Sequence, residues 1–484
     1  MKTPSLTRRG ILAVAASTGA AVLLAQPTGL VDTARGSANS NCDPHASITP
    51  YGINQAGITT NAPEHLQLAG FDLVAGTTRE QLIALLQTWQ EAIGLLTKGL
   101  PLPDAGAPDV APADTGEALS QSADRLTITI GFGPSLFDSR FGFTSLRPTA
   151  LVDLPAFTGD ALDPTASDGD LCLQCCAETR LVAEHALRTL ARLATGRATL
   201  RWTQSGFNEL PTNPADGAGR NLMGFKDGTA NLNPKDPARM ARNVWVDPSD
   251  GAAWLAGGTY LVYRRVVAKL REWDESVLSE QEDVFGRRRA TGAPFGGTRE
   301  NDPVRSELMP VTAHIRLANP RTGQDSEDER IFRRGYSFHD GLDATGEYNA
   351  GLVFISFQRD VRRQFIPLQT RLAASDALNE YIKHTASAIF VIPPGTTAAG
   401  YIGETLLGAA PPRTTTPNPA ADLRTPTVPG APAAPAAPAA PAAPAAPAKP
   451  AAPAAPGATP KAPTRAPRPK ATKAKPKRKR KKAR

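Results

Sequence analysis

The most regular hydrophobic pattern of the chain lies between residues 77 and 99, in TTREQLIALLQTWQEAIGLLTKG. Thr77 or Thr78 can cap the start of a helix there, Glu80 or Gln81 completes a capping box, and Gly99 can end it. Apolar side chains recur every three or four residues between these ends, which predicts an amphipathic helix: Leu82, Leu85, Leu86, Trp89, Ile93 and Leu96.

Two further stretches have a helical pattern. The first covers residues 177–195 and stops before Gly196, and we expect His185 to be an ordinary member of that helix. The second is DALNEYIKHT, residues 376–385, which we also predict to be helical. Alternation of apolar and polar residues predicts strands in three places: 125–133, 257–267 and 350–360.

The order of these elements indicates the fold class. A strand–helix–strand rhythm occurs twice, with short connections, which favours an α+β fold with two halves over one doubly wound sheet. The stretch ELPTNPADGAG has the composition of a linker, so we place the boundary near 205–215. The predicted domains are therefore 48–205 and 206–410. No Gly-rich dinucleotide loop or phosphate loop is present in the sequence.

The first 38 residues have the layout of an export signal. Arg8 and Arg9 precede an apolar run from Ile11 to Ala25, and small residues at Gly36 and Ala38 can define a cleavage site. The apolar run is short against the roughly 20 residues that span a bilayer. The paired arginines indicate a twin-arginine signal. We therefore expect an exported protein that is periplasmic, associated with the cell envelope or secreted.

The end of the chain differs in composition from the rest. Proline recurs every third residue from Pro429 to Pro456, so we expect residues 411–460 to form a Pro/Ala-rich linker. Residues 461–484 carry 13 Lys and Arg and no acid, and we expect them to be disordered.

The charge of the folded part is masked by this basic tail. The net charge of the chain is +8, but the tail contributes +13 and residues 1–38 contribute +3, which leaves −8 on residues 39–460. The folded part is therefore not expected to bind a specific nucleic acid. The tail can bind polyanions, and in an exported protein the expected partners are anionic polymers of the cell envelope.

Four cysteines are present, Cys42 and the cluster Cys172, Cys175 and Cys176. In an exported chain a disulfide is the ordinary expectation, although the sequence does not decide the pairing. No second ligand pair at zinc spacing follows, and Cys176 stands where covalent haem attachment needs a histidine. We expect no catalytic role for the cluster.

The stretch NLMGFKDGTANLNP places the carboxylate of Asp227 between two glycines, Gly224 and Gly228. Such a pattern is typical of a turn, because glycine accepts positive φ and aspartate caps local N–H groups. Small neighbours also allow the backbone to approach a flat ligand. Further along, His314 lies in VTAHIRLANPRTG and Arg333 in RIFRRGYSFHDG. A histidine, an acid and an arginine are the parts of a haem peroxidase site, but spacing alone does not select this interpretation.

The residues within these motifs narrow the choice of function. GFKDGTAN resembles the GxxDG signature of dye-decolourising peroxidases, and HIRLANPR and RRGYSF resemble the haem-binding segments of that family. Further similar stretches occur in the family's order over about residues 50–400: QAGI, TIGFG, DLCLQC, TGAPFGG and DALNEY. Together with the export signal, they resemble the exported branch that includes deferrochelatase/peroxidase proteins.

The resemblance implies a role for each matching residue. His314 would be the axial ligand of a haem b iron, one haem per chain, and Asp376 would accept the other N–H of its ring. Asp227 would be the distal acid–base and Arg333 the distal arginine. The residues expected to contact the haem are Gly228, Thr229, Ala230, Asn319, Pro320, Arg321 and Arg333. The family fold is a pair of ferredoxin-like domains with antiparallel sheets, as in a dimeric α+β barrel, with haem in the C-terminal half.

The implied reaction is the reduction of hydrogen peroxide and the one-electron oxidation of organic donors such as dyes and phenolics. An aspartic acid with its ordinary pKa near 3.9 acts as a base only when ionised, whereas histidine has an ordinary pKa of about 6.5. We therefore expect activity to persist at about pH 4 to 5.

Other interpretations remain at this point. Iron release from haem would use the same pocket, and an envelope-binding protein would use the tail. Cargo of a protein nanocompartment would need an apolar C-terminal peptide, which the basic C-terminus lacks. The sequence does not identify the donor, and it leaves a homodimer open.

Overall fold

The computed structural model describes residues 43–408 except 105, 210 and 214–215. The predicted signal 1–38, the linker 411–460, the basic tail 461–484 and Cys42 lie outside the described residues. Within the described part, none of the helices combines the length and apolarity that a bilayer crossing needs.

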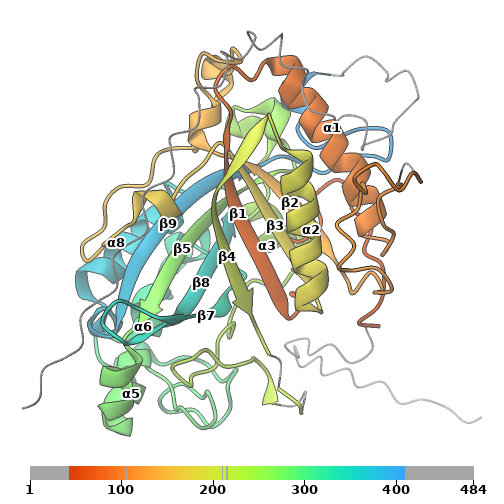
Figure 1. Ribbon diagram of the computed structural model, residues 1–484. Coiled ribbons are helices and arrows are strands. Elements are labelled where there is room, and N and C mark those ends of the chain that lie inside the picture. Colours follow the sequence, from red (N-terminus) through yellow and green to blue (C-terminus); the bar gives the residue numbers. More distant parts are fainter. Residues whose placement is uncertain (1–42, 105, 210, 214–215, 409–484) are drawn as a thin grey trace, which may run out of the picture. The chain divides into compact units, whose positions relative to one another are not determined.

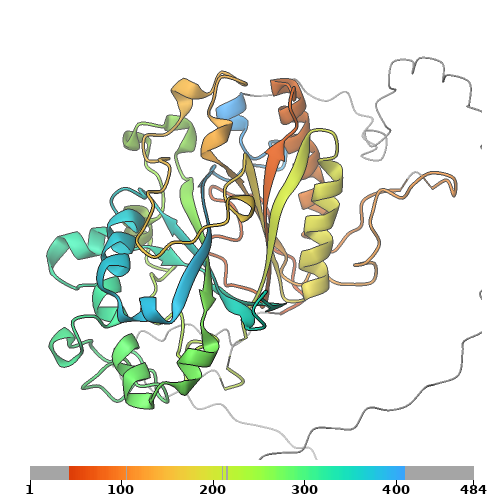
Figure 2. The same ribbon diagram turned by 60° about the vertical axis from the view of Figure 1, so that its left-hand side comes forward.

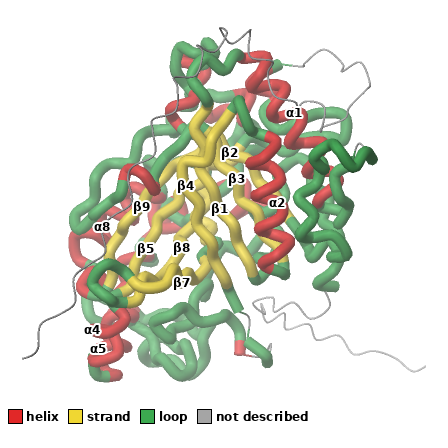
Figure 3. The backbone as a smooth tube through the Cα atoms, viewed as in Figure 1, coloured by secondary structure: helices red, strands yellow, loops and turns green. Residues whose placement is uncertain are grey.

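A single antiparallel sheet of nine strands forms the centre of the described chain (Figures 1 and 3). Its order is β5-β9-β2-β3-β1-β4-β7-β8-β6, and an additional pairing of β5 with β8 closes it into a barrel. The strands are β1 (His65–Leu73), β2 (Thr127–Phe132), β3 (Leu171–Ala177), β4 (Ala198–Phe207), β5 (Thr259–Ala268), β6 (Phe332–Arg333), β7 (Tyr336–Leu342), β8 (Tyr348–Gln358) and β9 (Ile382–Ile392).

Two places in the barrel, called thin seams below, are joined by only one pair of facing residues each. Phe132 of β2 faces Val391 of β9, and Phe207 of β4 faces Ser337 of β7, each as a single register pair. All other strand pairs share longer ladders, for example the register of Tyr260–Val267 in β5 with β8. The strands of residues 65–207 and those of residues 259–392 therefore pair mainly among themselves.

Helices cover the outside of the barrel on two opposite sides (Figure 2). One side carries α1 (Arg79–Leu96) and α2 (Arg180–Leu193), and the other carries α5 (Leu278–Phe285), α6 (His314–Ala318) and α8 (Phe365–Ser375). The remaining α-helices are short: α3 (Pro237–Asn243), α4 (Leu270–Glu275), α7 (Gly323–Asp328) and α9 (Glu404–Leu407).

The helix predicted from the strongest periodicity is confirmed as α1. Thr78 caps its N-terminus, accepting from Gln81 N at 3.2 Å, while Gln81 Oε1 accepts from Thr78 N at 2.9 Å. Trp89 is fully buried and donates from its indole to the Leu190 carbonyl at 2.8 Å, which ties α1 to α2. The apolar face of α1 is thereby buried against the sheet and its neighbour.

His185 makes buried polar contacts that were not predicted from the sequence. It lies on α2, as expected, but it is buried between Asp114 and Glu117, with N···O distances of 3.6 and 3.4 Å. Thr115 also hydrogen-bonds its ring at 3.1 Å. The histidine therefore fixes the segment around Asp114 to the helix.

The prediction of a helix over 376–385 is wrong. Only Ala377–Glu380 form a short 3₁₀ turn, η8, and β9 begins at Ile382. Asp376 caps this turn by accepting from Leu378 N at 2.9 Å, which stops the preceding helix α8 and redirects the chain into the sheet. The three predicted strands are confirmed as β2, β5 and β8, with ends shifted by a few residues.

The three cysteines of the described chain are buried free thiols on β3. Cys172 and Cys176 pack into the cluster inside the barrel, whereas Cys175 packs under α1 and α2. Burial raises the pKa of Cys172 and of Cys175 above the ordinary value. The disulfide expected for an exported chain does not form among these three.

Candidate active site

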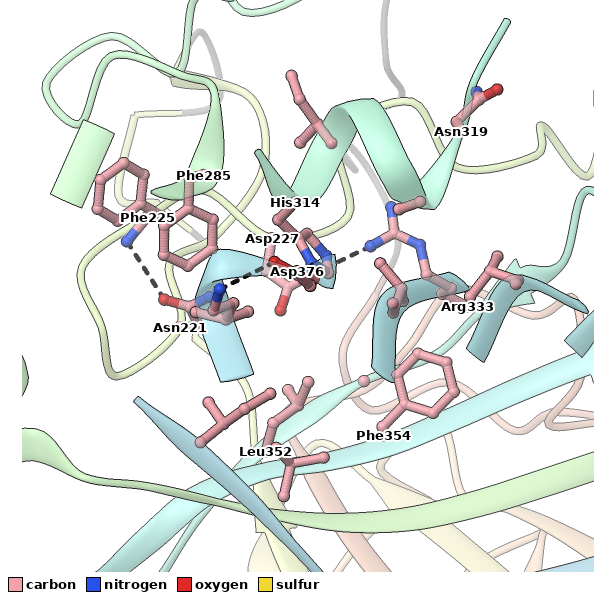
Figure 4. Close-up of a pocket in the computed structure, with 18 of the residues that line it drawn as sticks. Asn221, Phe225, Asp227, Phe285, His314, Asn319, Arg333, Leu352, Phe354 and Asp376 are labelled. Atoms are coloured by element: carbon pink, nitrogen blue, oxygen red, sulfur yellow. Dashed lines mark hydrogen bonds and ion pairs between the residues drawn. The ribbon is translucent and has the colours of Figure 1, made fainter. Parts of the chain in front are cut away.

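A deep cavity opens beside the C-terminal strands, between the sheet and α6 and α8 (Figure 4). Its floor is the outer face of β5, β8 and β9, where every second residue points into it. These floor residues are mostly apolar: Val266, Ala268, Leu352, Phe354 and Ile382. The cavity is therefore suited to a large apolar ligand with a few polar groups around it.

His314 enters the cavity from the N-terminal end of α6. Its Nδ1 lies 2.6 Å from Asp376 Oδ2, and Nε2 has no hydrogen-bond partner among the described residues. Burial lowers the pKa of His314, but the charge and hydrogen bond of Asp376 outweigh this effect and raise the pKa above its ordinary value. The imidazole is thus oriented by one nitrogen and free at the other.

Asp376 is itself held in place. Its side chain is only 3 % exposed, and its second oxygen, Oδ1, accepts from Leu378 N at 2.9 Å. The next residue, Ala377, donates its N–H to Thr312 O at 3.0 Å, two residues before His314. The carboxylate and the imidazole therefore belong to two segments that are fixed to each other.

Asp227 and Arg333 form the polar group opposite. Asp227 Oδ1 lies 3.5 Å from Arg333 Nη1, and both side chains are about one third exposed. Figure 4 shows both residues pointing toward His314. Both also act on the pKa of His314, which Arg333 lowers and Asp227 raises. The structure brings the three residues that the sequence singled out into one cavity.

The glycine-framed stretch around Asp227 is a turn as well as a cavity wall. Gly228 has φ +93° and Ala230 has φ +59°, and Asn231 N donates to Gly228 O at 3.2 Å. Gly228, Thr229 and Ala230 all line the cavity. The turn interpretation is therefore confirmed, and the turn places a backbone of small residues along the cavity wall.

Segment 330–333 fastens this turn from one side. Asn231 accepts from Arg333 N at 2.9 Å and donates to Arg333 O at 2.7 Å. Arg333 Nη2 donates to Thr229 O at 3.0 Å, and Arg330 Nη2 donates to Ala230 O at 2.6 Å. The loop that carries Asp227 is consequently hydrogen-bonded to the segment that carries Arg333 at several points.

The predicted residues after α6 also line the cavity: Asn319, Pro320 and Arg321. Arg321 has φ +59° and donates to the carbonyls of Ile315 at 2.9 Å and Asn319 at 2.6 Å, which fixes the end of α6.

Arg287 and Arg330 line the cavity too, and neither was predicted from the sequence. Burial lowers the pKa of Arg287 to about 10, and burial also lowers the pKa values of Arg321 and Arg330. Neighbouring guanidinium groups add to each of these shifts, so the wall carries positive charge in excess. Arg287 stands in GRRRATGAPFGG, and a run of arginines before a matching motif was the available signal.

This set of groups fits a haem. A cavity with a mostly apolar floor suits the macrocycle, and a histidine with a free ring nitrogen suits the iron. A second nitrogen held by a carboxylate is the usual support of a metal-binding histidine. The excess guanidinium charge suits the two carboxylates at the haem edge.

Comparison with known proteins agrees with this geometry. Residues 55–208 match the family model "Dyp-type peroxidase, N-terminal", and residues 218–397 match "Dyp-type peroxidase, C-terminal". The deferrochelatase of Escherichia coli (strain K12) is 36 % identical over 370 residues, covering 74 % of this chain and 86 % of that protein.

Solved structures give the same result. Ferric DtpA from Streptomyces lividans is similar at 38 % identity and a TM-score of 0.70, covering 76 % of this chain and 98 % of that one. A DyP-type peroxidase from Cellulomonas bogoriensis is 37 % identical with a TM-score of 0.68, covering 76 % and 100 %. The cavity and the fold define a haem-dependent peroxidase with haem b as its cofactor, as the sequence predicted. The chain belongs to the Dyp-type peroxidase family.

Proposed function

We propose that His314 binds the iron of haem b and that Asp227 and Arg333 handle hydrogen peroxide on the opposite face. The observation that carries the proposal is the His314 ring: Nδ1 is held by Asp376 at 2.6 Å, and Nε2 is left free in the cavity that Asp227 and Arg333 share. The haem then lies in the C-terminal half, against the outer face of β5, β8 and β9. In the same proposal, the two groups of strands joined by thin seams are two ferredoxin-like domains.

When bound, haem supplies the electrons that cleave the peroxide bond and later takes single electrons from an organic donor. Asp227 would take a proton from one oxygen of hydrogen peroxide and return it to the other, so that water can leave. Arg333 donates hydrogen bonds to the oxygen on which negative charge develops. Arg287, Arg321 and Arg330 supply positive charge for the haem carboxylates, and Gly228, Thr229 and Ala230 lie against the ring.

The test is the Asp227→Asn variant. Its haem spectrum should match the wild type, while its rate constant for reaction with hydrogen peroxide, measured by stopped-flow absorption, should fall by about 10² or more. An unchanged rate constant would remove Asp227 from the proposal. Activity that rises only through about pH 6 to 7 would equally contradict an aspartate base.

Iron release from haem is a second candidate, because the protein from Escherichia coli at 36 % identity bears the name deferrochelatase. It would use the same cavity without peroxide. Anaerobic incubation with haem and a reductant separates the two activities: iron-free porphyrin as product supports iron release, and intact haem contradicts it.

We further propose that the protein is exported by the twin-arginine pathway and held in the cell envelope by its basic tail. The paired arginines at Arg8 and Arg9 and the 13 positive charges of residues 461–484 support this proposal. Deleting residues 412–484 should release the protein from the envelope without changing its turnover. A parallel fall in turnover would show that the tail is more than a tether. Light scattering of the purified protein tests whether the chain forms a homodimer, which the sequence leaves open.

A further inference from the structure

The carboxylate of Asp227 has few direct supports. Among the described residues, its side chain makes one ion pair, at 3.5 Å to Arg333, and both partners are about one third exposed. Its position is therefore set by the backbone of residues 224–231. That backbone has positive φ angles at Gly224 and Gly228, which glycine accepts, and at Ala230, where a residue with a side chain keeps such a conformation only when its surroundings hold it.

Glu300 holds this loop on both sides of Asp227. Glu300 Oε2 lies 2.8 Å from Lys226 Nζ, the residue just before Asp227, and Glu300 Oε1 accepts from Thr229 Oγ1 at 2.7 Å. The Lys226 and Glu300 side chains are only 9 % and 10 % exposed. One buried carboxylate thus fixes residues 226 and 229, with Asp227 between them.

Two glycines of the surrounding backbone pack closely against this pair. A Cβ at Gly217 would collide with Glu300 Oε2, and a Cβ at Gly292 would come within 2.6 Å of the Lys226 Cδ. Gly217 and Gly292 have φ of +74° and +73°, so glycine suits both positions. The backbone of Glu300 is also tied to the cavity wall, since its carbonyl accepts from Arg287 Nη1 at 2.8 Å.

We propose that Glu300 is a positioning residue for Asp227, acting through its hydrogen bond to Thr229 and its ion pair with Lys226. The inference rests on the role proposed for Asp227 above. Proton transfer depends steeply on placement, and a shift of about 1 Å can cost about 10² in rate. Glu300 needs no contact with peroxide or haem to exert this effect.

A competing explanation is that Glu300 only neutralises Lys226, so that its removal would leave a buried, unpaired charge and lower stability. Two double variants separate the explanations. Lys226→Met with Glu300→Gln removes both charges but keeps an oxygen that can accept from Thr229. Lys226→Met with Glu300→Met removes both charges and the acceptor as well. Both double variants lose the other contacts of the Lys226 side chain, so these losses cancel when the two are compared.

The experiment uses the full haem-loaded chain. Hydrogen exchange measured by mass spectrometry reports on peptides covering residues 220–231, and stopped-flow absorption reports the rate constant with hydrogen peroxide. The control is Glu178→Gln, which breaks the Arg125–Glu178 ion pair, also largely buried, in the other half of the chain. This control should leave both readouts as in the wild type.

The proposal predicts a difference between the two double variants. The one with Glu300→Met should exchange its amide hydrogens faster over residues 224–231 than the one with Glu300→Gln. It should also react with hydrogen peroxide at least about tenfold more slowly, while its haem spectrum stays the same. Equal exchange and equal rates in the two double variants would overturn it in favour of simple charge neutralisation. Faster exchange without a change in rate would also overturn it. Failure of the proposed function is seen separately, because an unchanged rate in Asp227→Asn removes the role of Asp227 whatever Glu300 does to the loop.

Discussion

Asp376 Oδ2 lies 2.6 Å from His314 Nδ1, and this contact determines what the imidazole can do. The carboxylate holds the proton on Nδ1 and turns Nε2 into the cavity as a free ligand. The buried position of Asp376 and its bond from Leu378 N keep the pair from rotating.

Asp376→Asn should weaken haem binding. The amide can still accept from Nδ1, but the negative charge that makes the imidazole a better ligand is lost, and changes of this kind typically cost about 10- to 100-fold in metal affinity. Titration of the haem-free protein with haem, followed by absorption, measures the effect. Asp250→Asn, which affects an ion pair with Arg359 away from the cavity, should bind haem as the wild type does.

Arg333→Lys should keep the haem and lose speed. Lysine retains the charge, but it lacks the planar guanidinium, whose Nη2 donates to Thr229 O while its Nη1 faces Asp227. We expect the rate constant with hydrogen peroxide to fall by about 10² while the haem spectrum stays unchanged. Arg362→Lys at the surface is the matched control. An unaltered rate in Arg333→Lys would show that charge alone is sufficient.

His384 predicts an acid-sensitive stability. Burial and, to a lesser extent, Arg264 lower the pKa of His384, while Asp160 and Asp376 oppose them, and the net result is a pKa of about 4. Below the ordinary pKa of 6.5, the unfolded chain takes up a proton that the folded chain refuses, so stability falls as the pH drops from 6.5 to about 4. A shift of this size corresponds to roughly 3 kcal/mol.

His384→Gln should remove that part of the acid loss. Urea unfolding at several pH values between 7.5 and 4 checks the prediction, with His339→Gln, an exposed histidine, as control. If the free energy of unfolding fell with pH in parallel for the wild type and His384→Gln, His384 would not be the cause of the acid-sensitive stability.

The cysteine cluster should react only slowly with thiol reagents in the folded protein. Cys172, Cys175 and Cys176 are buried, and burial raises the pKa values of Cys172 and Cys175, so few thiolates are available to react. In a Cys42→Ser background, a thiol reagent should modify none of them rapidly under native conditions and all three after unfolding. Rapid native modification would contradict the packing on β3.

The sequence predicted elements best where one pattern acted alone. The helix α1 has a wide apolar stripe and a capping box, and both survive in the structure. The segment 376–385 failed because its apolar spacing fits a helix, whereas a cap at Asp376 and pairing of β9 with β5 decide its conformation. The strands β1 and β3 were missed because they are buried on both faces and so lack a clear alternation. The partly exposed strand β4 was missed as well.

Some residues of the site were predicted from the sequence and others were not. His314, Asp227 and Arg333 were found because their motifs resemble those of a family, and the structure places them in one cavity. Glu300, Arg287 and Arg330 were not, because each acts through contacts with residues far away in the sequence, such as the bond between Glu300 and Thr229. Such contacts exist only once the chain is folded.

The most direct test of the account is the visible absorption spectrum of the haem-reconstituted wild type beside His314→Ala. If His314 binds the iron, the wild type shows a Soret band typical of a histidine-bound haem, and His314→Ala loses this band or shifts it markedly, with recovery on adding imidazole. The same spectrum in both proteins would contradict the assignment of His314 as the iron ligand.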